Sequence, residues 1–199
     1  MDEKKMTEKQ SIRSKYLEAR NALTREERIG KSTLIWENLQ KEKAYAEAEI
    51  LLVYMDYRSE VVTGSFVAEL LEDKKKRIFA PTVEGMYISF YEVTSMTELV
   101  SGYQGIREPV SGIKRKFDKE IMKKHKCLLL VPGSVFDAGM GRMGYGKGFY
   151  DRFLEEHDSV IKAGLAFDCQ IAKKVPEEAH DIKMDMIITE SRVIKKQGD

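Results

Sequence analysis

The first forty residues carry the pattern of two helices. The segment from about Thr7 to Asn21 is rich in good helix formers, and charged residues cover most of its surface. Its apolar residues fall at helical spacing, at Ile12, Tyr16 and Leu17. This periodicity predicts a first helix with one face that packs on the rest of the protein.

A second helix is predicted from Thr24 to about Lys41. Thr24 and Glu27 have the spacing of a capping box, in which the hydroxyl accepts from the N–H three residues on and the carboxylate reaches back to the first N–H. The residues expected on the buried face of this helix are Ile29, Trp36 and Leu39.

Beyond residue 48 the pattern changes to short apolar runs. The run from Ile50 to Met55 is nearly continuous, as in a strand that is covered on both faces. Further strands are predicted at residues 78–80 (closed by Pro81), 86–92, 126–131, 160–167 and 186–189, and helices at 63–73 and 149–156.

Strands that alternate with helices predict an α/β fold around a largely parallel sheet. The length of 199 residues fits a single domain over residues 1–199, with residues 1–8 as a polar N-terminal leader. No internal repeat or linker interrupts the chain. Residues 101–119, which hold three glycines and a proline, are expected to form an ordered loop.

Charge and hydropathy exclude several classes of protein. Lys and Arg number 34 and Asp and Glu 33, so the formal net charge is +1. A balanced charge argues against a general nucleic-acid or membrane-surface binder, which needs a dominant basic field. No apolar run approaches the length of a membrane span, and the first residues lack a secretory signal. We expect a cytoplasmic protein that binds neither nucleic acid nor membrane.

The cysteines and histidines offer no evident site. Cys127 and Cys169 are far apart and form no CxxC pair, so a disulfide scaffold or a cysteine zinc site is not expected. The remaining candidates, His125, His157 and His180, are isolated and are expected to be surface or core residues rather than ligands.

The segment from Pro132 to Asp151 is the most unusual in the chain. It follows a buried strand, and five glycines fall between residues 139 and 148. Glycines at alternate positions let backbone N–H groups converge on an anion, and the helix that follows adds its N-terminal dipole. With Arg142 and Lys147 beside them, these glycines predict a phosphate site, most simply for a nucleotide. The alternative is a glycine-rich turn with solvated basic residues.

Neither standard phosphate motif explains this loop. Lys147 is followed by Gly148 rather than by Ser or Thr, so the Walker A pattern fails. Residues 139–144 match GxGxxG literally, but they lie well past the end of the strand and late in the chain.

The loop resembles that of the 5-formyltetrahydrofolate cyclo-ligases, also called 5,10-methenyltetrahydrofolate synthetases. Residues 132–137 read PGSVFD and residues 142–151 read RMGYGKGFYD, similar to the family's PGxxFD and RLGxGxGYYD. The resemblance covers nearly the whole chain, and its other matching segments are Lys9 to Arg13, Glu60-Val61, residues 105–109 and Asp185. The departures are Phe149 for a usual Tyr and Met143 for a Leu.

The resemblance implies a fold and an activity. The fold is the three-layer α/β/α sandwich of the sugar-phosphate isomerase and CoA-transferase kind, here in a monomer. The activity is the ATP- and Mg²⁺-dependent cyclisation of 5-formyltetrahydrofolate to 5,10-methenyltetrahydrofolate, with release of ADP and phosphate. Phosphorylation turns the N5-formyl oxygen into a leaving group, so that N10 can close the ring. Such chemistry needs alignment and charge neutralisation more than a nucleophile–base pair.

The resemblance also implies roles for individual residues. Arg142 and Lys147 are the expected catalytic cations. The expected ATP contacts are Lys9, Gln10, Ser11, Ile12, Arg13, Arg142, Met143, Gly144, Tyr145, Gly146, Lys147, Gly148, Phe149 and Tyr150. The expected folate contacts are Met55, Glu60, Tyr145, Gly146, Lys147, Gly148 and Phe149, with Tyr103 as a further aromatic wall. Asp151 and Asp185 are the expected Mg²⁺ ligands, because Mg²⁺ prefers hard oxygen donors.

Two other functions stay open at this point. A sugar-phosphate isomerase-like enzyme would use the loop for a single phosphate and would need a poised Glu or His near it, and none is evident. A non-catalytic nucleotide- or RNA-binding protein would need a basic face with interleaved aromatic residues.

Overall fold

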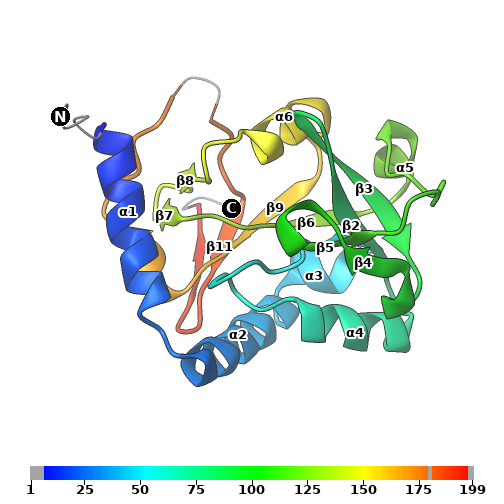
Figure 1. Ribbon diagram of the computed structural model, residues 1–199, viewed down its shortest axis with the longest axis horizontal. Coiled ribbons are helices and arrows are strands. Elements are labelled where there is room, and N and C mark those ends of the chain that lie inside the picture. The colour runs from blue at the N-terminus through cyan, green and yellow to red at the C-terminus, as the bar shows by residue number, and fades with distance from the viewer. Residues whose placement is uncertain (1–6, 179–180, 197–199) are drawn as a thin grey trace.

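The computed structural model describes residues 7–178 and 181–196. Six α-helices form within these residues: α1 (Glu8–Asn21), α2 (Arg25–Gln40), α3 (Lys43–Glu47), α4 (Gly64–Asp73), α5 (Lys119–Lys124) and α6 (Phe149–Glu156). No helix in these two ranges is long and apolar enough to cross a bilayer. Figure 1 shows a sheet between two layers of helices, with α1 standing at one side of the molecule.

Seven strands make the central sheet, in the order β12-β11-β9-β6-β1-β2-β3. Their bounds are β1 (Ile50–Leu52), β2 (Arg77–Glu84), β3 (Tyr87–Val93), β6 (Cys127–Val131), β9 (Ile161–Leu165), β11 (Met186–Ile188) and β12 (Val193–Lys195). The five inner strands are parallel, and only the edge strands β3 and β12 pair antiparallel. The predicted α/β fold with a largely parallel sheet is confirmed.

The strand order places the natural binding crevice beside β1. The chain moves from β1 to β2 on one side and later returns to β6 on the other side of β1. In open α/β sheets, ligands bind outside the carboxyl ends of the strands at this switch of direction. The segments that leave β1 and β6 are residues 53–63 and 132–148, so both predicted halves of the site meet there.

Alternate residues of the central strands pack against the two helix layers. Leu51 and Leu128 share one hydrophobic cluster with Trp36 of α2 and Val67 of α4. The adjacent residues of the same strands, such as Leu52 and Leu129, belong to a second hydrophobic cluster that includes Phe153 of α6. Figure 1 shows α2 and α4 on one side of the sheet and α6 on the other. Burial on both faces explains why these strands are continuous apolar runs.

Two smaller sheets lie outside the main one. The first, in the order β10-β7-β8, is formed by β7 (Val135–Asp137), β8 (Arg142–Met143) and β10 (Ile171–Ala172). The second pairs β4 (Leu99–Ser101) with β5 (Arg107–Pro109). Three short 3₁₀ turns complete the elements at Met96–Glu98, Tyr103–Gly105 and Asp168–Gln170. The predicted loop over residues 101–119 is therefore ordered, and it contains β5 and the start of α5.

Both N-terminal helices start at a capping box. The predicted box of Thr24 and Glu27 is confirmed, and Thr7 forms a second one with Gln10. Of the predicted leader, residues 1–6 lie outside the described residues. The structure corrects the remainder, because Thr7 caps α1 and Glu8 begins it.

Two local predictions are wrong. Ile29 is 47% exposed, because the buried side of α2 begins a turn later at Ser32 and continues through Ile35. Pro81 does not close its strand, since β2 continues to Glu84. Beyond Phe79 only β3 pairs with β2, so the missing N–H of Pro81 faces an unpaired edge.

The histidines behave as predicted where they are described. His157 is buried and stacks on Phe153 with ring centroids 4.3 Å apart, while His125 pairs with Glu49 near the surface. His180 lies outside the described residues. Cys127 packs in the core, and burial raises the pKa of its thiol to about 11.

Candidate active site

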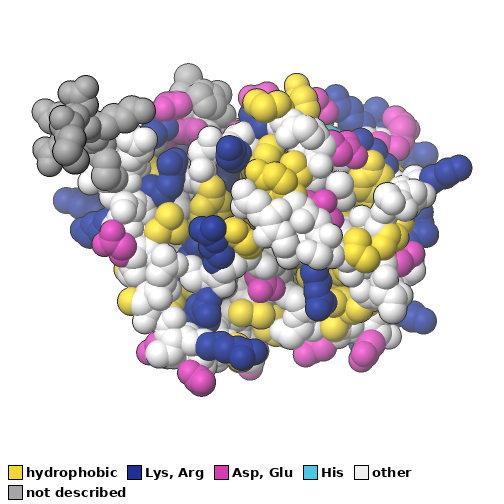
Figure 2. Space-filling model, in the orientation of Figure 1, with side chains coloured by type: hydrophobic (Ala, Val, Ile, Leu, Met, Phe, Trp, Pro, Cys, Tyr) yellow, Lys and Arg dark blue, Asp and Glu magenta, His cyan; other side chains and the backbone are white. Residues whose placement is uncertain are grey.

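A cavity of about 670 Å³ opens at the carboxyl edge of the sheet. Its walls come from α1, from the segment after β1, from the loop after β6 and from the turn around Tyr103. On the face seen in Figure 2, Lys and Arg side chains gather between α1 and the middle of the molecule. The predicted residues that line the cavity are Lys9, Arg13, Met55, Glu60, Tyr103, Arg142, Met143, Gly144, Tyr145, Gly146, Lys147, Gly148, Phe149, Tyr150 and Asp151.

The first half of the glycine-rich loop does not face the cavity. The N–H groups of Gly139 and Gly141 both donate to one carboxylate oxygen of Asp137, each at 2.9 Å. The other oxygen accepts from the N–H of Val175 at 2.6 Å. Asp137 is buried, so it is an internal anion that occupies this nest. The expectation that all five glycines serve one phosphate is therefore wrong.

The second half of the loop lines the cavity, and hydrogen bonds from two other segments hold it in place. Gly146 and Gly148 have φ of +85° and +63°, which is the left-handed region that favours glycine. The guanidinium of Arg13 reaches across from α1, and its Nε donates to the carbonyl of Gly144 at 3.0 Å. The hydroxyl of Ser134 donates to the carbonyl of Met143 at 2.7 Å. Two separate elements thus fix this turn at the start of α6.

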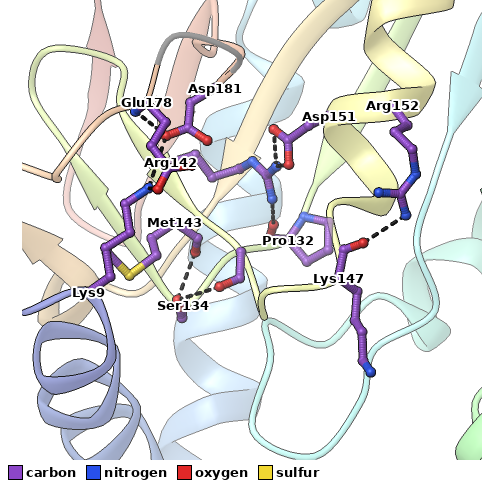
Figure 3. Close-up of polar contacts among 11 residues, drawn as sticks. Lys9, Pro132, Ser134, Arg142, Met143, Lys147, Asp151, Arg152, Glu178 and Asp181 are labelled. Atoms are coloured by element: carbon purple, nitrogen blue, oxygen red, sulfur yellow. Dashed lines mark hydrogen bonds and ion pairs between the residues drawn. The ribbon is translucent and has the colours of Figure 1, made fainter. Parts of the chain in front are cut away.

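Arg142 forms a buried ion pair with Asp151. Its Nη2 lies 2.8 and 2.9 Å from the two carboxylate oxygens, and its Nη1 donates to the carbonyl of Pro132 at 3.3 Å (Figure 3). The Arg142 side chain is 4% exposed, and its Nε lacks a hydrogen-bond partner within the described residues. Arg142 therefore positions Asp151 and the start of α6, and Asp151 already neutralises part of its charge.

Lys147 offers a cation that is not committed to a carboxylate. Within residues 7–178 and 181–196 its ammonium group forms no ion pair, and its side chain extends away from the Arg142–Asp151 pair (Figure 3). Its carbonyl accepts from Arg152 Nη2 at 2.7 Å. The same guanidinium donates to the carbonyl of Met86 and lies over the ring of Phe149. Arg152 thus ties the loop to the tip of the β2–β3 hairpin.

Lys9 lies between α1 and the segment before β11. Its ammonium is 2.8 Å from Glu178 and 3.5 Å from Asp181. Burial lowers the pKa of Lys9, but its hydrogen bond to Glu178 and the charge of Asp181 outweigh that effect, and the net pKa is raised. Lys9 is therefore a charged ammonium at the rim of the cavity. Lys9 and Arg13, four residues apart on α1, face the same cavity, as their spacing predicts.

Glu60 is a buried acid in the cavity wall, within hydrogen-bond reach of the Tyr145 hydroxyl of the turn. It is 7% exposed, and the N–H of Tyr57 donates to its carboxylate at 2.9 Å. Burial raises the pKa of Glu60, while the Tyr145 hydroxyl, the Tyr57 N–H and the charge of Arg20 oppose that rise. Met55 lies beside it in the cavity wall. This wall combines a hydrogen-bond acceptor with an apolar surface, as a flat heterocycle requires.

The structure does not bring four predicted residues to the cavity. Gln10 closes the capping box of α1, Ser11 is exposed, and Ile12 packs against a small cluster that contains Met143. They lie on other faces of α1 than Lys9 and Arg13. The fourth is Asp185, which is also absent from the cavity wall.

Asp185 lies at the amino end of β11, and the cavity lies at the carboxyl ends of the parallel strands. It pairs with Lys162, whose ammonium is 2.9 Å away. Its carboxylate also accepts from the backbone N–H of that residue at 2.7 Å. Asp185 therefore does not meet Asp151. Within residues 7–178 and 181–196, no three His, Cys, Asp or Glu side chains form a metal site by themselves.

Sequence reasoning missed four residues that shape the site. Arg20 is a buried cation in the last turn of α1, and it donates to Tyr145. Asp137 holds the first half of the loop, and Arg152 holds the second half. The Tyr54 hydroxyl donates to the carbonyl of Val61, the residue after Glu60. Nothing in the sequence indicates the burial of Arg20, because an Arg near a helix end is ordinarily solvated. For Asp137, the nearby glycines at positions 139 and 141 were the available signal.

The fold and the cavity together define the class of protein. It is an α/β protein whose cavity, at the switch point of a parallel sheet, is lined by a cationic glycine turn and a buried acid. Comparison with known proteins identifies the group. The model of the 5-formyltetrahydrofolate cyclo-ligase family matches residues 5–190. The chain therefore belongs to this family, and it is an enzyme with the family's cyclo-ligase activity.

Relatives and solved structures agree with this assignment. The chain is 29% identical to a probable 5-formyltetrahydrofolate cyclo-ligase of Caenorhabditis elegans, over 86% of this chain and 87% of the other. It is 26% identical to the cyclo-ligase of Mus musculus, over 92% and 93% of the two chains. The solved structure of 5,10-methenyltetrahydrofolate synthetase from Aquifex aeolicus is 33% identical, with a TM-score of 0.84 over 97% of this chain and 95% of that one.

Proposed function

We propose that this enzyme couples ATP consumption to the conversion of 5-formyltetrahydrofolate into 5,10-methenyltetrahydrofolate, with release of ADP and phosphate. One observation carries the proposal: a single cavity is lined both by a cationic glycine turn and by a buried carboxyl group in an apolar wall. The first suits a triphosphate and the second suits a reduced pterin, so the reacting oxygen and phosphorus atoms can meet between them.

The phosphate half of the cavity consists of the turn from Gly144 to Gly148 and the cations around it. Lys147 provides a charge that pairs with no carboxylate in the described part of the chain, and Arg13 presents its guanidinium beside Gly146. Lys9 adds a third cation at the rim. Positive charge aimed at the transferring phosphoryl group stabilises the charge that develops there, and it costs no rearrangement at the moment of reaction.

The folate half is built on Glu60 and Met55. As a carboxylate, Glu60 accepts hydrogen bonds from the amino and ring N–H groups of the pterin, while Met55 covers one face of the ring. A buried acid with a raised pKa is also what a sugar-phosphate isomerase would need near its loop. Membership of the cyclo-ligase family favours the folate role over that alternative.

The proposed reaction has two steps. The formyl oxygen attacks the γ-phosphorus of ATP, ADP leaves, and the formyl group becomes an iminium phosphate. N10 then attacks the formyl carbon to close the ring and loses its proton, which the departing phosphate accepts as it leaves with the former formyl oxygen. Neither step requires a protein nucleophile. Both require fixed alignment, which the double support of the turn by Arg13 and Ser134 supplies.

Asp151 is the residue that would hold Mg²⁺ with the nucleotide. It lines the cavity at the first turn of α6, and its hard oxygen donors suit a cation that takes one or two carboxylates together with phosphates and water. When bound, Mg²⁺ offsets charge on the phosphate oxygens. Arg142 holds the Asp151 carboxylate in place for this role.

The test measures both products at once. Purified protein is mixed with ATP, Mg²⁺ and 5-formyltetrahydrofolate, and the methenyl chromophore and free phosphate are followed together. The proposal requires one phosphate per methenyl group formed, and loss of both signals when ATP is omitted or when a chelator removes Mg²⁺. Folded protein that forms the methenyl product at the same rate without ATP, or that hydrolyses ATP without folate turnover, contradicts it.

A further inference from the structure

Arg20 is a buried cation whose hydrogen bonds go to neutral groups. It is 3% exposed, and it forms no ion pair within residues 7–178 and 181–196. A buried arginine ordinarily pairs directly with an acid, because the loss of water around its charge is unfavourable. A buried charge in a cavity wall without such a direct pair calls for an explanation beyond stability.

Three elements of the cavity meet at the Arg20 guanidinium. Its Nε donates to the hydroxyl of Ser59, 3.0 Å away, in the segment after β1. Its Nη1 donates to the Tyr145 hydroxyl at 2.6 Å, in the glycine turn. The same atom also donates to the carbonyl of Gly133 at 3.3 Å, where the loop leaves β6. The guanidinium lies over the Tyr145 ring as well, 5.6 Å from its centroid.

We infer that Arg20 is a positioning residue that fixes the segment of Glu60 against the Tyr145 side of the cavity. The inference rests on the proposed function, in which Glu60 accepts hydrogen bonds from the pterin. Arg20 holds Ser59, the residue next to Glu60, and through Tyr145 it holds the turn that binds phosphate. One side chain of α1 thus connects the folate half to the ATP half.

The charges around Glu60 explain why a cation is needed there. Burial raises the Glu60 pKa, and the charge of Arg20 lowers it. Among the described residues that act most strongly on Glu60, Arg20 is the cation, and the other ionisable groups are neutral or acidic: Tyr54 and Asp56 after β1, Tyr145 in the turn and Tyr150 in α6. Arg20 is therefore the charge that favours the ionised form, which alone accepts from every pterin N–H group.

The experiment measures binding of 5-formyltetrahydrofolate by calorimetry over a range of pH, for wild type, Arg20→Met and Arg20→Lys. Folate affinity falls as pH drops through the Glu60 pKa. Without Arg20 this fall moves to higher pH, so at a pH within the wild-type fall the Kd for folate rises, by up to about tenfold for a shift of one pH unit. The Kd for ATP rises less, because Arg13 and Ser134 still hold the turn when Arg20 is removed. Arg20→Lys keeps the charge and restores most of the pH profile.

A double-mutant cycle separates this role from a merely structural one. In a Glu60→Gln background no carboxylate remains to be favoured, so Arg20→Met has little further effect on folate affinity. A purely structural role predicts the same loss in both backgrounds and at every pH, and that result overturns the inference. If Arg20→Met does not fold, Arg20→Gln replaces it under the same criteria.

Arg25→Met is the matched control, since Arg25 is an exposed residue outside the cavity in the neighbouring helix. It should leave the folate affinity and its pH profile unchanged. Failure of wild type to bind or turn over folate contradicts the proposed function itself. Normal wild-type binding with an unchanged profile in Arg20→Met contradicts only the inference.

Discussion

The two halves of the glycine-rich loop have similar compositions and different tasks. In residues 137–141 the glycine N–H groups converge on the protein's own Asp137 carboxylate. In residues 144–148 the backbone turns toward the cavity, where Arg13 and Lys147 supply positive charge. An anion nest is thus present in the first half but already occupied. Glycine density marks backbone that converges on an anion, and only the surrounding charges distinguish an internal anion from a ligand.

The largest effect expected from this difference is on Lys147. Lys147→Ala should lower kcat/KM for ATP by about 100- to 1,000-fold, because it removes the cation of the turn that no acid neutralises. The melting temperature should change little, since the Lys147 ammonium supports no ion pair among the described residues. Steady-state kinetics and a thermal melt check both. A large loss of Tm with normal kcat/KM would assign the second half a structural task as well.

Asp137 should behave in the opposite way. Asp137→Ala leaves three N–H groups without their acceptor, at Gly139, Gly141 and Val175. The free energy of unfolding in urea should fall by about 3 kcal/mol, as expected for a broken buried network. Asp158→Ala, at an exposed position, is the matched control and should change it by less than about 0.5 kcal/mol. An equally small change for Asp137 would show that the first half is not held by this carboxylate.

Two alanine substitutions compare the halves directly. A Cβ at Gly141 would lie 2.9 Å from an Asp137 oxygen, so Gly141→Ala should cost about 1–3 kcal/mol of stability and leave the KM for ATP unchanged. Gly146 has φ of +85°, so Gly146→Ala shifts the turn at a cost of about 1–2 kcal/mol and should raise the KM for ATP several-fold. If Gly141→Ala raised the KM for ATP and Gly146→Ala left it unchanged, the first half of the loop would be the one that binds ATP.

Asp185 should give the smallest effect. It lies at the amino end of β11 in a partly exposed pair with Lys162, so Asp185→Asn should change stability by less than about 1 kcal/mol. The Mg²⁺ concentration that gives half-maximal rate should stay at the wild-type value, whereas Asp151→Asn should raise it. A shift of the Mg²⁺ requirement in Asp185→Asn would restore Asp185 to the metal site.

Periodicity was enough to predict most of the fold. Helices and parallel strands with one or two buried faces produce repeating patterns, and α4 with its buried Phe66, Val67, Leu70 and Leu71 is one example. The small sheet of β7, β8 and β10 was missed because its strands have two or three residues, which is too short for a pattern.

The sequence predicted the site residues that belong to a motif and that reach the cavity through backbone groups or charged side chains. Arg142 to Asp151 and Glu60 lie at its wall as expected. Arg20 could not be predicted, because its burial depends on Ser59 and Tyr145, which are distant in sequence. Asp185 was misplaced because its position in the chain does not reveal at which end of the sheet it lies.

We propose that residues 144–148 bind the triphosphate of ATP and that residues 137–141 do not. Backbone amide resonances, followed by NMR while Mg-ATP is added, distinguish the two segments. Large shifts are expected at Gly144, Gly146 and Gly148, with Gly139 and Gly141 nearly unchanged. Shifts centred on Gly139 and Gly141, or saturating ATP without any shift in the loop, would contradict it.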